Sequence, residues 1–234
     1  MKKTTLILLV SFILINVSFT QPKRLYVDIK TSLADLKGMI KFAKPGTTIF
    51  FRQGHYVFNN TINIRNKNYL KIIGLGKVKI VCNATDVSVL SLFHCKNITI
   101  SNLHLTHNPM AEGCSGFVMS TSDCKNIVIN TCKLNGCGVT GLITWSTSGI
   151  ILDNCDIFNN SSSGLCFNGS KNITISNCRI YKNKETGLGL YRSENVTIIN
   201  TKIYNNNVGL EIHKTKKVYM RGVRTYNNGI NVKK

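Results

Sequence analysis

Acidic residues are scarce in this sequence. Only 10 of its 234 residues are Asp or Glu, against 30 Lys or Arg, and the formal net charge is +20. A chain with this balance repels cations and attracts anions, so the expected partner is an acidic polysaccharide or a cell-envelope polymer, and no specific nucleic acid is expected. A compositional bias toward Lys, Asn and Ile, with a solvated lysine surface, is the alternative explanation.

Long apolar runs are also scarce, because only residues 6–17 form one. Lys2 and Lys3 precede this run and small residues follow it, so residues 1–20 are expected to be a signal peptide. The run is short for a membrane span, and no second run follows. No cysteine stands at the expected cleavage site, which argues against a lipoprotein anchor. We expect a secreted or periplasmic product without a membrane span; a retained signal anchor is the alternative.

Most of the chain repeats one unit. In residues 171–190, KNITISNCRIYKNKETGLGL, three short segments alternate apolar and polar residues and are joined by turn residues. The unit recurs at separations of 29, 23, 23, 23 and 22 residues. Its anchors are Ile98, Ile127, Ile150, Ile173, Val196 and Val218. This period predicts an all-β solenoid of parallel coils, about six to seven in number.

Equivalent positions of the unit carry similar residues. Each residue of a β coil stacks about 4.8 Å from its equivalent, so the inward columns should be apolar and alike. One such column reads Ile100, Ile129, Leu152, Ile175, Ile198 and Met220. Cys132, Cys155 and Cys178 share another and are expected to act as small buried hydrophobes. Asparagines mark two turn columns, through Asn177 and Asn183, because Asn tolerates left-handed backbone and bonds locally.

The motif K-N-I-T-I-S-N-C-x-I-x-x-N, followed by G-L-x-[LFI], resembles the repeats of right-handed parallel β-helix proteins of the pectate-lyase-like superfamily. The resemblance extends from about Leu70 to the C-terminus and is greatest to short NosD-like repeat proteins. It implies a single-stranded right-handed β-helix, whereas the spacing alone does not give the hand. The superfamily includes lyases, hydrolases, epimerases and non-enzymes, so the resemblance selects no substrate.

Residues 21–56 depart from the repeat. Ser32 is expected to cap a helix, SLADLKGMIKFA, with Asp35 at the capping-box position. This segment resembles the N-terminal cap of exported β-helices, which covers the apolar end of the first coil. We therefore expect a signal peptide at 1–20, a cap with strand, helix and turn at 21–56, and β-helix repeats at 57–234. No comparable cap follows the last coil, so a monomer with a lysine-guarded edge is expected, and end-to-end association is the alternative.

One insertion interrupts the repeat. Thirteen residues separate Leu105 from Met119, and loops that leave a regular solenoid often carry its specificity. His104, His107 and Glu112 are the candidate catalytic residues there, because imidazole and carboxylate groups can transfer protons. The alternative is a rigid loop without chemistry.

The same insertion contributes to a disulfide candidate, Cys114 with Cys137, which stands at the matching turn of the next coil. No third ligand accompanies the two histidines at fixed spacing. We therefore expect no metal site and no cofactor.

Outward positions of the second segment form a candidate substrate-binding surface. Its basic members are Lys133, Arg179, Lys202 and Arg224, and its aromatic members are Phe158, Tyr181, Tyr204 and Tyr226. We expect the cations to bind carboxylates or sulfates and the rings to pack on sugar faces. The alternative is that the rings stack on one another only to stabilise the sheet.

Catalysis is weakly supported. Fold relatives that hydrolyse pectin use clustered aspartates, and relatives that cleave by β-elimination use acidic Ca²⁺ ligands with a Lys or Arg base. The aspartates of this sequence form no such cluster on neighbouring coils. The leading interpretation is an exported β-helix that binds an anionic carbohydrate; if it also modifies it, it acts as a polysaccharide lyase, hydrolase or epimerase. The rival interpretation is a non-catalytic structural or interaction module of the NosD-like type.

Overall fold

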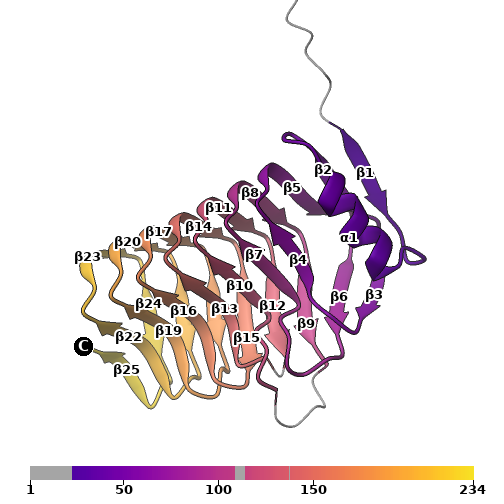
Figure 1. The fold of residues 1–234 in the computed structure, drawn as a ribbon. Helices are drawn as coiled ribbons and strands as arrows, with labels where there is room; N and C mark the ends of the chain where they lie inside the picture. The colour runs from indigo at the N-terminus through magenta and orange to yellow at the C-terminus, as the bar shows by residue number, and fades with distance from the viewer. Residues whose placement is uncertain (1–22, 109–113, 137) are drawn as a thin grey trace, which may run out of the picture.

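The chain folds into a parallel β solenoid with one short helix near its N-terminal end (Figure 1). The computed structural model describes residues 23–108, 114–136 and 138–234. Within them the strands form three parallel sheets of nine, eight and eight strands, which we name A, B and C. The chain visits A, then B, then C in every coil, so each sheet is built from every third strand.

Sheet A contains β1 (Arg24–Val27), β2 (Thr48–Phe51), β5 (Asn68–Gly74), β8 (Lys96–Ser101), β11 (Lys125–Asn130), β14 (Ser148–Asp153), β17 (Lys171–Ser176), β20 (Glu194–Ile199) and β23 (Lys216–Arg221). Sheet B contains β3 (Gly54–Phe58), β6 (Val78–Cys82), β9 (His104–His107), β12 (Lys133–Gly136), β15 (Asp156–Asn160), β18 (Arg179–Tyr181), β21 (Lys202–Tyr204) and β24 (Arg224–Tyr226). Sheet C contains β4 (Ile62–Arg65), β7 (Leu90–Phe93), β10 (Met119–Ser122), β13 (Thr140–Trp145), β16 (Ser163–Asn168), β19 (Thr186–Tyr191), β22 (Val208–His213) and β25 (Ile230–Lys233).

The solenoid has about nine turns, since eight three-stranded coils follow β1 in the described residues. The expected count of six to seven coils is therefore too low. The first two coils, β2–β4 and β5–β7, lack most of the repeat motif, which is why the sequence period missed them. β2 pairs with β5 and β3 pairs with β6, so the solenoid begins inside the segment 21–56.

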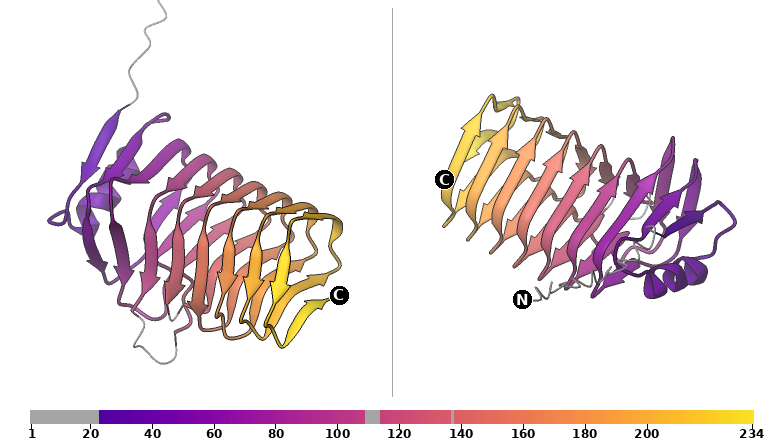
Figure 2. Two further views of the ribbon diagram at one scale, coloured as in Figure 1. Left: turned by 180° about the vertical axis from the view of Figure 1, so that it is seen from behind. Right: turned by 90° about the horizontal axis from the view of Figure 1, so that it is seen from above.

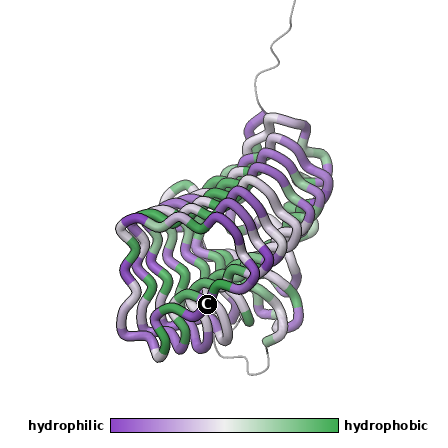
Figure 3. The backbone as a smooth tube through the Cα atoms, turned by 90° about the vertical axis from the view of Figure 1, so that its left-hand side faces the viewer, coloured by the Kyte–Doolittle hydropathy of each residue, from purple (hydrophilic) through white to green (hydrophobic). Residues whose placement is uncertain are grey.

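The predicted column through Ile175 is confirmed by the strand register. Ile175 pairs with Leu152 on one side and Ile198 on the other, and all three are buried. Figure 3, which looks at the C-terminal end of the solenoid, shows hydrophobic and hydrophilic residues alternating along the coils. The core is therefore a continuous apolar cylinder with polar groups alternating outward.

The two asparagine columns serve different purposes. At the turn from sheet A to sheet B, Asn102, Asn154, Asn177 and Asn200 all have φ between 47° and 54°, as expected for left-handed turn residues. The other column is buried: the Asn160 side-chain amide donates to Asn183 Oδ1 at 2.8 Å, and the Asn183 amide donates to the next asparagine at 3.0 Å. There the left-handed residue is the preceding one in the chain, such as Lys182.

The N-terminal end is covered as expected. Helix α1 (Leu33–Phe42) starts at Ser32, whose hydroxyl accepts a hydrogen bond from the Asp35 backbone N–H at 3.1 Å. Leu36 and Ile40 are buried from the same face of the helix. Figure 2 shows the helix lying across the N-terminal end of the solenoid. Both side chains belong to the hydrophobic core, so the helix closes the core at this end. Over the three described ranges, no helix reaches the length and apolarity that crossing a membrane requires.

Candidate functional site

The candidate surface lies on sheet B and on the turn from sheet A into it, here called the A–B corner. One outward column, the basic column, continues coil by coil in the predicted register and extends two coils further toward the N-terminus, where His55 pairs with Lys79. From there it runs through Lys79, His104, Lys133, Asp156, Arg179, Lys202 and Arg224. Lys79 was missed because its coil lacks the motif, although the alternation in KVKIV already indicated an outward lysine.

The most basic part of this surface is a cavity of about 380 Å³ at the A–B corner. Its lining includes Lys77, Lys79, His104 and Lys133, together with Gly76, Val78, Asn102, Leu103 and Thr131. Among the residues that the structure describes, no acidic side chain belongs to this lining. Lys79 and Lys133 lie two strand spacings apart, about 9.6 Å, with His104 on the coil between them.

His104 is held in place rather than free to titrate at neutral pH. Its Nε2 atom lies 2.5 Å from Asn135 Oδ1. Partial burial lowers the pKa of His104, the bond to Asn135 opposes this shift, and the nearby charges of Lys79 and Lys133 lower the pKa further. At neutral pH the positive charge of the cavity is therefore carried by its lysines.

A second cavity, of about 310 Å³, lies on the same corner three coils further along. It is lined by Asn154, Asp156, Asn177, Cys178, Arg179, Asn200 and Lys202. Arg179 binds Asp156 through two hydrogen bonds, Nε to Oδ1 at 2.6 Å and Nη2 to Oδ2 at 2.7 Å. This pair neutralises the guanidinium, so the middle of the basic column offers less positive charge than its two ends.

The aromatic residues form a second column beside the basic one, the ring column. Neighbouring rings are parallel within 6°, with centroids 5.2 Å apart for Phe158 and Tyr181 and 5.0 Å apart for both later pairs, ending at Tyr226. Rings in this arrangement cover each other's faces. The ring faces that point toward one another are therefore not accessible for packing against sugars, which was the predicted mode. The ring edges and the tyrosine hydroxyls remain accessible to a ligand. Burial raises the pKa of Tyr181 and Tyr204, which keeps these hydroxyls protonated as donors.

Of the three predicted catalytic residues, the structure describes His104 and His107, which stand at the two ends of strand β9. His107 was expected on the inserted loop, but it ends strand β9 and is fully buried, with Nε2 3.0 Å from the Phe117 carbonyl oxygen. The strand continues to residue 107, and alternation then places His107 on the inward side with Leu105. Burial lowers its pKa. Glu112 lies outside the described residues.

The cysteines are mostly core residues. Cys132, Cys155 and Cys178 are buried free thiols in one column, as expected. Cys114 is disulfide-bonded; its predicted partner, Cys137, lies outside the described residues, so the pairing stays a prediction. Among the described residues, no group of three or more His, Cys, Asp or Glu side chains is arranged to hold a metal ion.

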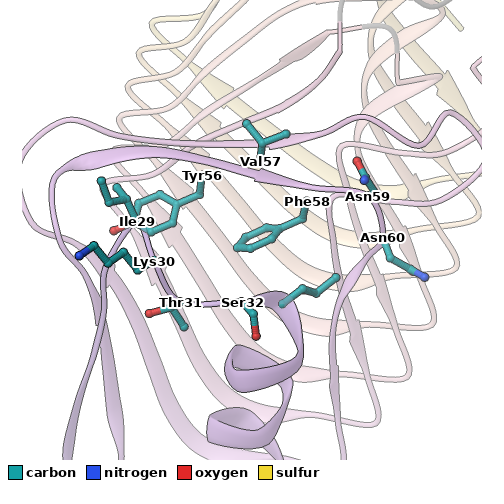
Figure 4. Close-up of a pocket in the computed structure, with 10 residues that line it drawn as sticks. Ile29, Lys30, Thr31, Ser32, Tyr56, Val57, Phe58, Asn59 and Asn60 are labelled. Atoms are coloured by element: carbon teal, nitrogen blue, oxygen red, sulfur yellow. The ribbon is translucent and has the colours of Figure 1, made fainter.

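A further cavity, of about 450 Å³, lies between the start of α1 and strand β3. Figure 4 shows Tyr56 and Phe58 in this hollow above Ser32. The polar groups there serve the cap: the Tyr56 hydroxyl donates to the carbonyl oxygens of Arg52 and Val27, and Ser32 caps the helix. We assign this hollow to the structure of the cap.

Comparison with known proteins shows which fold the chain has. No curated protein matches the sequence significantly. Among solved structures, pectate lyase Pel9A is 14% identical with a TM-score of 0.61, covering 85% of this chain and 64% of that one. PfbA, a surface adhesin of Streptococcus pneumoniae, is 13% identical with a TM-score of 0.69, covering 86% and 61%. The A-module of a mannuronan C-5 epimerase from Azotobacter vinelandii is 15% identical with a TM-score of 0.52, covering 86% and 74%.

The chain spans less than two thirds of the pectate lyase and of the adhesin, and at these identities the likeness shows the fold alone. The family model of the right handed beta helix region matches residues 49–232, most of the chain. The strand order of the three parallel sheets agrees with that match. The chain belongs to the right-handed β-helix family.

Proposed function

We propose that this protein is an exported binding protein for an anionic glycan, which lies along the A–B corner. The observation that carries the proposal is the cavity in which Lys77, Lys79 and Lys133 gather, with no acidic side chain in the described part of its lining. Ammonium groups grouped in this way, on a scaffold of high net charge, form a seat for a carboxylate or sulfate.

The rest of the corner extends this seat along the solenoid axis. Beyond the neutralised pair of Asp156 and Arg179, the basic column resumes with Lys202 and Arg224. The tyrosine hydroxyls of the ring column run parallel to it and can donate to ring or hydroxyl oxygens of a sugar. A glycan chain lying along the corner would therefore meet charge at both ends, with tyrosine hydroxyl groups beside the charge at the C-terminal end.

The names of several proteins with this fold support a carbohydrate ligand. They include the pectate lyase, the mannuronan epimerase and a hydrolase of a sulfated galactose polymer. Binding without turnover is the form we propose, because the described residues assemble no acid–base pair at the corner: His107 is buried and His104 is bonded to Asn135.

The test measures binding of the purified protein to polygalacturonate, alginate and chondroitin sulfate by calorimetry at low and at high salt. We expect at least one polymer to bind, with affinity that falls steeply as salt rises. Replacing both Lys79→Ala and Lys133→Ala should lower that affinity at least about 10-fold, since each lost ammonium removes a charge-assisted contact.

The matched control is the pair Lys96→Ala and Lys125→Ala, two exposed lysines on neighbouring coils of sheet A. It removes the same charge from another face. Equal losses of affinity in the two double variants would show that the binding depends on net charge alone. If none of the three polymers binds, the proposal is wrong and the protein is better explained as a structural module.

Export rests on the leader at residues 1–20 and is tested separately. The N-terminal residue of the protein recovered from the medium or periplasm should be Gln21. Recovery of the intact chain in the membrane fraction would indicate a retained anchor.

A further inference from the structure

The third corner of the solenoid, where sheet C turns into sheet A, carries a different pattern of aromatic residues. One outward column at the end of the sheet C strands reads Phe93, Ser122, Trp145, Asn168, Tyr191 and His213. Aromatic residues thus occur on every second coil, and a smaller polar residue stands between them. This corner belongs to neither the basic column nor the ring column.

The spacing matters because it leaves the ring faces uncovered by one another. Rings on adjacent coils, as on sheet B, stack at about the strand spacing. Trp145 and Tyr191 stand two coils apart, about 9.6 Å, with Asn168 on the coil between them. A cavity of about 460 Å³ occupies this place, and its lining is Trp145, Ser146, Asn168, Gly169, Tyr191, Arg192 and His213.

Trp145 is one wall of this cavity. The residue is 36% exposed, and its ring meets Phe117 nearly edge to face, with centroids 5.5 Å apart and planes at 69°. The coils on either side place Ser122 and Asn168 next to it, neither of which carries a ring. An indole in this setting has apolar surface available to a guest molecule.

Tyr191 is the other wall, and it is fixed in place. Its ring lies over Gly189 so closely that a Cβ at that position would come within 2.5 Å of Tyr191 Cε2. The Tyr191 hydroxyl donates to Glu211 Oε2 at 2.8 Å, and Glu211 Oε1 lies 2.9 Å from Lys233 Nζ. A glycine that makes room for the ring and a carboxylate that anchors it produce a rigid platform.

The platform does not extend to the remaining aromatic residue of the column. The next aromatic residue of the column, Phe93, has the Arg65 guanidinium 4.9 Å from its ring centroid, so one of its faces is already occupied. Between the two open walls, the Asn168 amide donates to Cys166 Sγ at 3.3 Å, which directs its amide NH₂ along the strand toward Cys166 on the same face and leaves Oδ1 as an acceptor.

We propose that Trp145, Asn168 and Tyr191 form a second glycan site, which takes a neutral linear oligosaccharide. Two aromatic walls on alternate coils would each stack against one sugar ring, and Asn168 and Ser146 would bond the hydroxyl groups between them. A neutral ligand fits because the lining carries a single guanidinium, of Arg192, in place of the lysine group of the A–B corner. This site is independent of the function proposed above.

The sequence supplies its own probe, because Trp145 is the one tryptophan of the chain. The experiment titrates the purified protein with cellohexaose, xylohexaose and chitohexaose at high salt and follows tryptophan emission. We expect a saturable emission change with at least one of them, insensitive to salt because ring stacking is not screened. Three flat titrations would overturn the proposal.

Two variants locate the binding. Tyr191→Ala removes a wall and should weaken the affinity roughly 10-fold, whereas Tyr219→Ala, which truncates an exposed ring on strand β23 of sheet A, should leave it unchanged. If Tyr191→Ala fails to fold, Asn168→Ala gives the same reading with about a 3- to 10-fold loss for one hydrogen bond. Unchanged affinity in the folded variants would place the emission change elsewhere and refute the site. The double variant Lys79→Ala and Lys133→Ala should lose binding of the anionic polymers but give an unchanged tryptophan titration. This result would show that the two proposed sites are independent.

Discussion

Replacing Ile175→Asp should abolish or nearly abolish folding. Ile175 is fully buried between Leu152 and Ile198 of the adjoining coils. Truncating such a side chain costs about 2–5 kcal/mol. Burying a carboxylate adds the cost of raising its pKa by about 3 units or more, at 1.36 kcal/mol per unit, or about 4 kcal/mol. The sum of about 6–9 kcal/mol is comparable to the whole stability of a typical domain.

The assay is urea denaturation followed by circular dichroism, with Thr174→Asp as the matched control. Thr174 is the preceding residue and points outward, half-buried beside Ile151 and Thr197. Its replacement should cost about 1 kcal/mol or less. Because the Asp introduced at position 175 has a higher pKa folded than unfolded, its penalty should shrink as the pH falls toward the unfolded pKa. Equal losses from the two variants, or a penalty independent of pH, would refute the column assignment.

Three further outcomes are expected. Asp156→Asn frees its arginine partner and should raise the affinity for an acidic glycan about 3- to 10-fold at low salt, by calorimetry, with little change in stability because the Arg179 half of the pair is largely exposed. Asn183→Ala leaves a backbone N–H and a side-chain amide of Asn160 without their acceptor and should cost about 2–4 kcal/mol in denaturation. Lys233 lowers the pKa of Glu211, so this pair stabilises the fold above pH 4.5, and the gain is lost as the pH falls through the folded pKa. Lys233→Met should therefore reduce the loss of stability in acid by under about 1 kcal/mol, measured by thermal melts at several pH values.

The residue spacing predicted which residues of one coil lie beside which residues of the next. The period places Ile175 beside Leu152 and Tyr181 beside Phe158, and the structure pairs them in that way. Strand pairing is a property of the backbone, and similar units repeat it from coil to coil. The same reasoning extends to turns, where asparagines such as Asn177 adopt the left-handed conformation that their side chain favours.

The residue spacing could not predict the orientation of a side chain or the residue at which a strand ends. Columns place the tyrosines side by side, but the tilt of each ring decides whether its face meets a sugar or the next ring. His107 depended on whether β9 continued into the insertion, and the strand does include it. The link between Asp156 and Arg179 was visible as neighbours in one column, whereas its two-bond geometry comes only from the side chains.

The central claim is that an acidic sugar binds between Lys79 and Lys133. A crystal structure of the protein with an oligogalacturonate tests this most directly. The account predicts a carboxylate within hydrogen-bonding distance of both lysine Nζ atoms, beside His104, and further sugar rings following the A–B corner toward the C-terminus. A ligand bound on another face, with the cavity of Lys79 and Lys133 occupied only by solvent, would contradict it.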